Sequence, residues 1–95
     1  MKHYPITKKI KDQANLLALA GEPARIRILC LLFDNPSACV HEIADGVDIT
    51  IALASHHLQA MKDAGLVECE RHGQTMCYQI TDSDFIKKLK TIIYE

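Results

Sequence analysis

The stretch at residues 50–65 has the apolar periodicity of one amphipathic helix. On the side away from the apolar stripe it carries His56 and Gln59, with Ser55 near the boundary. A surface helix normally covers its solvent face with long charged side chains, whereas these small and hydrogen-bonding groups can approach a base edge closely. We therefore predict that this helix lies in the major groove of DNA. The apolar stripe consists of Ile51, Ala54, Leu58 and Met61.

Thr50 stands where this helix begins and is predicted to be its N-cap. The free backbone N–H groups of the first turn then lie near any phosphate that approaches. His57 lies beside the apolar stripe, so we interpret it as a packed, hydrogen-bonded histidine rather than a base-contacting one. The DNA contacts expected from the helix are Thr50, Ala52, Ser55, His56, Gln59 and Lys62.

A nucleophilic pair can be imagined from Cys39 and His41. Two residues apart on a short helix, however, their side chains would diverge. The sequence also has no glycine-rich phosphate loop and no paired acid motif. We therefore predict that the protein is not an enzyme.

Apolar periodicity predicts three helices before this segment, at residues 7–20, at 23–33 and from 39 or 40 to 45. Gly21 suits the C-terminal cap of the first helix, and Pro23 suits the first turn of the second. The short third helix, the turn at residues 46–48 and the helix at 50–65 form a helix-turn-helix arrangement. The expected apolar faces are Ile10, Ala14, Leu17 and Ala18, then Ile26, Leu29, Cys30 and Phe33 with Ile28 and Leu32 extending that surface, then Val40, Ile43 and Ala44.

After Gly65 the pattern changes to two strands, at residues 66–71 and 75–81, which form a β-hairpin around the turn at residues 72–74. A hairpin directly after a recognition helix is typical of the wing of a winged helix. Arg71 and His72, near its tip, are expected to contact phosphate or the minor groove. A last helix at residues 84–94 begins after a cap at Asp82 or Ser83. Its apolar stripe consists of Phe85, Leu89, Ile92 and Ile93.

These elements predict a mainly α fold, a single winged helix-turn-helix domain over residues 1–95 with about five helices and a two-stranded wing. A chain this short buries little surface, and the apolar stripes of its first and last helices exceed what one small core needs. We therefore expect a homodimer whose interface is formed by the helices within residues 1–20 and 82–95. The two recognition helices would then lie one DNA turn apart, about 34 Å.

The net charge of −1 argues against indiscriminate binding to nucleic acid, although local basic patches are compatible with a sequence-specific binder. No apolar run approaches the ~18 residues of a membrane span, and the polar, basic start predicts no secretory leader. The four cysteines lie in or beside strongly periodic segments. We therefore expect free thiols in a cytoplasmic protein.

The chain resembles the ArsR/SmtB family of small bacterial winged-helix repressors over about residues 16–93. The sequence PARIRIL at residues 23–29 is similar to the family pattern P-x-R-x-x-I-L. SHHL at 55–58, Met61 and DAGLV at 63–67 are similar to S-x-H-L-x-x-L-x-x-A-G-L-V. Gly73 and Tyr78 match the G-x-x-x-x-Y of the family's wing.

The resemblance implies a dimeric repressor that binds double-stranded operator DNA and leaves it when an inducer binds. Ser55, His56 and Gln59 match positions that face bases or phosphate. The chain departs from the family at Ile51 and Ala52, where members often have polar residues. These two residues either meet thymine methyl groups, or Ile51 belongs to the core. The operator sequence and the regulated genes therefore stay open.

The resemblance also implies a candidate inducer site. Cys39 matches the first ligand position of metal-sensing members, and His41 takes the place of their second. A thiolate and an imidazole suit Zn, Cd or As(III), and a further ligand would have to come from elsewhere, such as the partner subunit's His3. The alternative is that Cys39 is a half-buried structural residue and His41 a surface one. No cofactor is fixed by the sequence.

Thiol chemistry is an alternative form of regulation. Cys30 matches a cysteine of redox-switching members, but their second cysteine, near the end of the last helix, is missing here. Cys30 is therefore interpreted mainly as core packing. Cys69 and Cys77 lie on opposite sheet faces if the hairpin loop has two or four residues, and opposite each other if it has three. A further alternative is a winged helix that serves only as a protein-interaction module.

Overall fold

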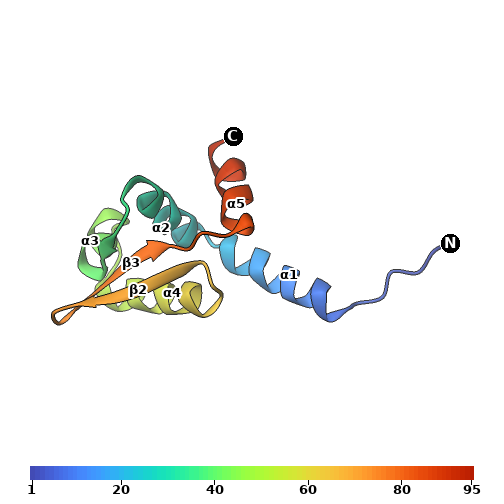
Figure 1. Cartoon of the computed structure of the whole chain (residues 1–95), viewed down its shortest axis with the longest axis horizontal. Coiled ribbons are helices and arrows are strands. Elements are labelled where there is room, and N and C mark those ends of the chain that lie inside the picture. Colours follow the sequence, from blue (N-terminus) through green and yellow to red (C-terminus); the bar gives the residue numbers. More distant parts are fainter.

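The computed structural model describes the whole chain, Met1–Glu95, and consists of five helices and three short strands (Figure 1). The predicted mainly α fold is confirmed. None of the helices has the length and apolar character needed to cross a membrane. The elements are α1 (Lys8–Ala20), α2 (Pro23–Asp34), β1 (Ala38–Cys39), α3 (Val40–Gly46), α4 (Ile51–Asp63), β2 (Val67–His72), β3 (Thr75–Ile80) and α5 (Asp84–Tyr94).

Local side-chain chemistry sets the ends of the helices. The Gly21 N–H donates to the carbonyl of Leu17 and ends α1, and Pro23 occupies the first turn of α2. The Glu22 side chain accepts from the backbone N–H of Arg25 at 3.1 Å, which makes Glu22 the N-cap of α2. The hydroxyl of Ser83 caps α5 in the same way. The predicted roles of Gly21 and Pro23, and Ser83 as one of two candidate caps, are therefore confirmed.

The wing belongs to a three-stranded antiparallel sheet in the order β1-β3-β2. The prediction of a two-stranded wing is therefore incomplete, because Ala38 and Cys39 pair with Tyr78 and Cys77. Strand β1 is only two residues long, which is too short for an alternating pattern to reveal. Its pairing joins the start of the helix-turn-helix to the wing.

The hairpin register separates one pair of cysteines and leaves another pair in contact. The loop has two residues, Gly73 and Gln74, because His72 pairs with Thr75. Cys69 then lies opposite Tyr78, and Cys77 lies one position further along, so the two thiols are on opposite faces of the sheet. Cys77 instead forms a disulfide with Cys39 of β1. The expectation of free thiols is therefore wrong for Cys39 and Cys77, and only Cys30 and Cys69 are free.

The core lies between α2, α3, α4 and one face of the sheet. At α2 the predicted Leu29 is buried together with Ile28 and Leu32, the two residues expected to extend the apolar surface, while Ile26 and Cys30 are only half-buried. The residues with almost no exposed surface are Ile28, Leu29, Ile43, Ala54, Leu58 and Met61. At α4 the predicted stripe is confirmed except at Ile51, which is 55% exposed because it precedes the first turn that packs on the core.

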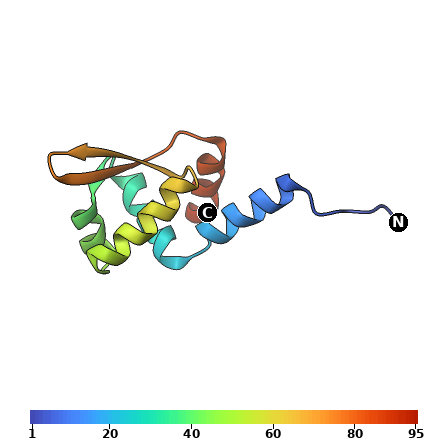
Figure 2. The ribbon, with the colours of Figure 1, turned by 90° about the horizontal axis from the view of Figure 1, so that it is seen from below.

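Helix α1 extends away from the rest of the domain toward the N-terminus (Figures 1 and 2). Its predicted apolar stripe does not pack on the core, and Ile10 and Leu17 are 46% and 59% exposed. On α5, Ile86 and Leu89 are buried whereas Ile92 is 66% exposed. The chain thus leaves apolar side chains on the two helices predicted to form a subunit interface.

Candidate nucleic-acid interface

The first turn of α4 and the tip of the β2–β3 hairpin lie at the same end of the molecule, opposite the N-terminus (Figures 1 and 2). One side of α4 packs on the core through Ala54, Leu58 and Met61, and the other side is open to solvent. Every DNA contact predicted on the helix is exposed. These exposed residues are Thr50, Ala52, Ser55, His56, Gln59 and Lys62.

The start of α4 is built to meet an anion. The Thr50 hydroxyl accepts from the backbone N–H of Leu53 at 3.0 Å, which confirms the predicted N-cap. The N–H groups of Ile51 and Ala52 have no intrahelical acceptor at this position. An exposed helix start with unpaired donors favours a phosphate oxygen.

Further along the helix, Gln59 is held in place by its own turn. The side-chain amide of Gln59 donates to Asp63 at 2.9 Å. This contact leaves the amide oxygen of Gln59 free as an acceptor on the exposed side. His56 and Lys62 lie on the same open side, and they provide a ring nitrogen and a positive charge.

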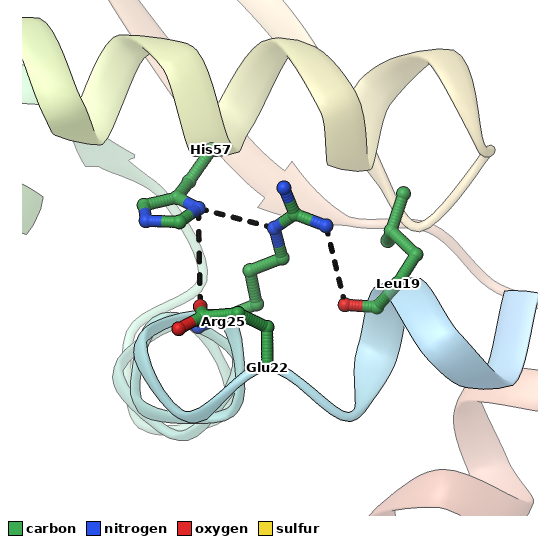
Figure 3. Close-up of polar contacts among 4 residues, drawn as sticks. All are labelled: Leu19, Glu22, Arg25 and His57. Carbon is green, nitrogen blue, oxygen red and sulfur yellow. Dashed lines mark hydrogen bonds and ion pairs between the residues drawn. The ribbon is translucent and has the colours of Figure 1, made fainter.

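His57 is buried and is hydrogen-bonded to Arg25 of α2, as Figure 3 shows. The Arg25 Nε–H donates to His57 Nδ1 at 3.1 Å, so Nδ1 carries no proton in this arrangement. Glu22 places a carboxylate oxygen 3.9 Å from the same nitrogen. The interpretation of His57 as a packed histidine is thereby confirmed.

Arg25 connects three helices through one guanidinium group. Besides His57 of α4, it donates to the backbone carbonyl of Leu19, near the end of α1, at 3.4 Å (Figure 3). These contacts fix α4 against the junction of α1 and α2, and so position the exposed side of α4. Sequence reasoning included Arg25 only as part of a motif and gave Glu22 no role, since both act through a residue more than 30 positions away.

The wing residues predicted to contact DNA are exposed near the hairpin tip. Arg71 has no ion-pair partner, and its cross-strand neighbour is Met76. The His72 Nε2 lies 3.5 Å from a carboxylate oxygen of Glu70. The wing therefore offers a free guanidinium and an exposed imidazole beside a carboxylate.

The candidate metal ligands do not come together. Cys39 is bonded to Cys77, so it offers no thiolate, and His41 and His3 are exposed. Nowhere in the chain do three His, Cys, Asp or Glu side chains form a group that could hold a metal ion. The residues of a single oxidised chain thus do not fit the expected metal site.

Cys30 lies on α2 beside the end of α5. A hydrogen bond with Cys30 raises the pKa of the Tyr94 hydroxyl, and desolvation raises it further. The Tyr94 ring also packs edge-on against Phe33, with ring centroids 5.9 Å apart. Cys30 thus helps to attach α5 to α2, in agreement with its interpretation as a packing residue.

Comparison with known proteins agrees with this geometry. The sequence profile described as "Bacterial regulatory protein, arsR family" matches residues 22–68. An uncharacterised HTH-type transcriptional regulator, MJ1325 of Methanocaldococcus jannaschii, is 34% identical over 93% of this chain and 98% of its own length. The HTH-type transcriptional repressor SmtB of Mycobacterium tuberculosis is 37% identical over 82% of this chain, but the match covers only 58% of that repressor.

A solved structure supports the same fold. The homodimeric winged helix-turn-helix DNA-binding domain of Mb0332 from Mycobacterium bovis superposes with a TM-score of 0.72 and 26% identity. The match covers 95% of this chain and 86% of that chain. That domain belongs to a protein described as a possible ArsR-family transcriptional regulator.

Proposed function

This chain belongs to the ArsR family of bacterial regulatory proteins, and we propose that it represses transcription by binding operator DNA through α4. The observation that supports the proposal is the solvent-exposed side of α4, which carries small and hydrogen-bonding groups. On the buried side, the hydrogen bond between Arg25 and His57 holds the helix in place. A surface built in this way suits direct contact with base edges in the major groove.

The two parts of the interface have different tasks in this proposal. His56 and Gln59 contact base edges, and Ser55, Thr50 and Lys62 contact base or phosphate groups. At the wing, Arg71 and His72 contact phosphate or the minor groove. Phosphate contacts position the protein on the duplex, whereas base contacts select the sequence. Because the net charge is −1, affinity depends on these local groups rather than on a basic surface.

We further propose that the repressor is a homodimer joined through α1 and α5. Ile10, Leu17 and Ile92 are exposed apolar side chains on these helices, and a partner subunit would cover them. A two-fold dimer contacts a palindromic operator, with half-sites about 34 Å apart. The homodimeric description of the Mycobacterium bovis domain supports this arrangement.

The test is salt-dependent binding to a duplex that carries the chain's own promoter, measured by fluorescence anisotropy. The variant His56→Ala/Gln59→Ala removes two base contacts and is expected to weaken specific binding by about tenfold or more. The variant His3→Ala/Gln79→Ala removes the same side-chain types from exposed positions outside α1, α4 and α5 and is the matched control. Unchanged affinity of the first variant would refute the assignment. Salt-independent binding, or none, would favour a protein-interaction module.

For the inducer, we propose that any metal response needs reduced Cys39. The resemblance to metal-sensing members implies Zn, Cd or As(III), but the Cys39 sulfur is bonded to Cys77. Thiolates are the form that binds these ions. The protein–DNA complex is therefore titrated with each ion with and without a phosphine reductant. Release from DNA by a metal ion in the oxidised protein would contradict this proposal.

The same disulfide favours a second candidate function, a thiol-responsive regulator. The Cys39–Cys77 bond connects the helix-turn-helix to the wing, so its loss removes one connection between the two parts of the DNA interface. Reduction by a dithiol breaks the S–S bond by exchange, yields two protein thiols and converts the reagent to a cyclic disulfide. A DNA affinity that is equal in both redox states would exclude this candidate.

A further inference from the structure

One apolar side chain at the start of α4 is exposed where the sequence pattern predicts burial. Ile51 is the first residue of the helix and is 55% exposed. Single exposed apolar residues are common on protein surfaces. Ile51 differs from them by its location, since it follows the N-cap Thr50 at the helix end that enters the major groove in helix-turn-helix proteins.

Helical geometry aligns Ile51 with the proposed base contacts. Residues four apart lie one above the other on a helix surface, so Ile51, Ser55 and Gln59 form one row along α4. All three are exposed. Leu53, which is 43% exposed, lies two positions further along the chain and therefore points to another side of the helix. Ile51 thus extends the row of base contacts, and Leu53 does not.

The chemistry of Ile51 selects one feature of the groove. Its side chain has no hydrogen-bonding group, so it cannot read the donors and acceptors of base edges. The apolar group in the major groove is the 5-methyl of thymine. Isoleucine is branched at Cβ and has few rotamers, so little freedom is lost when it packs against a methyl group.

We propose that Ile51 is a specificity-determining residue that selects a T·A pair in each half-site by packing on the thymine methyl. The inference rests on the proposed function, because it requires that α4 occupies the major groove. It adds a preference that neither His56 nor Gln59 provides, since both of these contact polar groups.

The experiment removes the methyl from the DNA and the side chain from the protein. Duplexes bound by the native chain are selected from a random library, and each thymine of the recovered half-site is replaced in turn by deoxyuridine, which lacks only the methyl. Binding is measured for the native chain, Ile51→Ala and Ile51→Val. Leu53→Ala is the matched control, because it truncates a neighbouring exposed apolar residue that lies outside the row.

One thymine is expected to carry the effect. Loss of its methyl weakens binding of the native chain by about fourfold, the factor for one buried methyl group, and Ile51→Ala shows little further sensitivity at that position. Ile51→Val keeps most of the sensitivity, and Leu53→Ala keeps all of it. Full sensitivity in Ile51→Ala, or no sensitive thymine in the native chain, overturns the inference. Failure to recover any preferred sequence overturns the proposed function itself.

Discussion

The Cys39–Cys77 disulfide is the feature whose loss we expect to change stability most. It joins residues 38 positions apart and closes a loop that contains α3, α4 and most of the hairpin. The perturbation is reduction of the native chain by a phosphine, which breaks the bond without changing any side chain volume. The double variant Cys39→Ser/Cys77→Ala provides the same state without reductant, with serine at an N-cap position where it is favoured.

The magnitude follows from the length of the loop. A crosslink restricts the unfolded chain, and closing a loop of this length corresponds to about 4 kcal/mol at 25 °C in the chain-entropy description. Small domains have free energies of unfolding of roughly 5–15 kcal/mol. Reduction is therefore expected to remove a large part of the stability of this domain.

The assay is urea denaturation with and without reductant, followed by circular dichroism. Thiol counting in denaturant should find two free thiols, Cys30 and Cys69, before reduction and four after it. The variant Cys30→Ser/Cys69→Ser keeps the crosslink and should retain the sensitivity to reductant. Equal urea midpoints in the two redox states, or four free thiols in the untreated protein, would refute the reasoning.

Three further predictions concern single side chains. Arg25→Ala leaves His57 Nδ1 without its donor and should lower the free energy of unfolding by about 1–3 kcal/mol in urea titrations; an unchanged midpoint would show that the contact contributes nothing. Thr50→Ala removes the cap of α4 and should cost about 1 kcal/mol in thermal unfolding, whereas Thr50→Ser should match the native chain. Burial raises the pKa of Tyr78 above 10.0, with Cys69 raising it further and Lys62 opposing both. The unfolded chain then loses this proton first, so stability is full below pH 10 and falls as the pH rises above it. Tyr78→Phe should show a smaller fall, and an identical pH profile would contradict this assignment.

Features set by neighbouring residues could be predicted from the sequence. Gly21, Pro23 and Thr50 each act on a helix end within four residues of their own position, so composition and spacing reveal their roles. The open side of α4 could be predicted as well, because helical periodicity separates His56 and Gln59 from the buried stripe.

Features that depend on residues far apart in the sequence could not be predicted. The bond from Arg25 to His57 joins positions 32 residues apart, and the disulfide depends on strand β1, which is too short to leave a pattern. Helical periodicity places Ile51 at the boundary between buried Leu58 and exposed Ser55, and the core does not reach the first turn of α4, so the Ile51 side chain is exposed. The position of a residue around the helix axis therefore does not predict its burial where the helix extends beyond the core.

The contacts of Arg25 have a mechanical consequence for how two subunits can act on DNA. One guanidinium group holds the carbonyl of Leu19, at the end of the helix with the exposed apolar face, and the imidazole of His57, behind the recognition surface. The same side chain therefore links the end of α1 to α4. If pairing of two copies tilts α1, then α4 must follow the tilt or one of the two hydrogen bonds must break. In the proposed dimer, the spacing of the two recognition helices and the angle at which each enters its groove would therefore not be independent quantities.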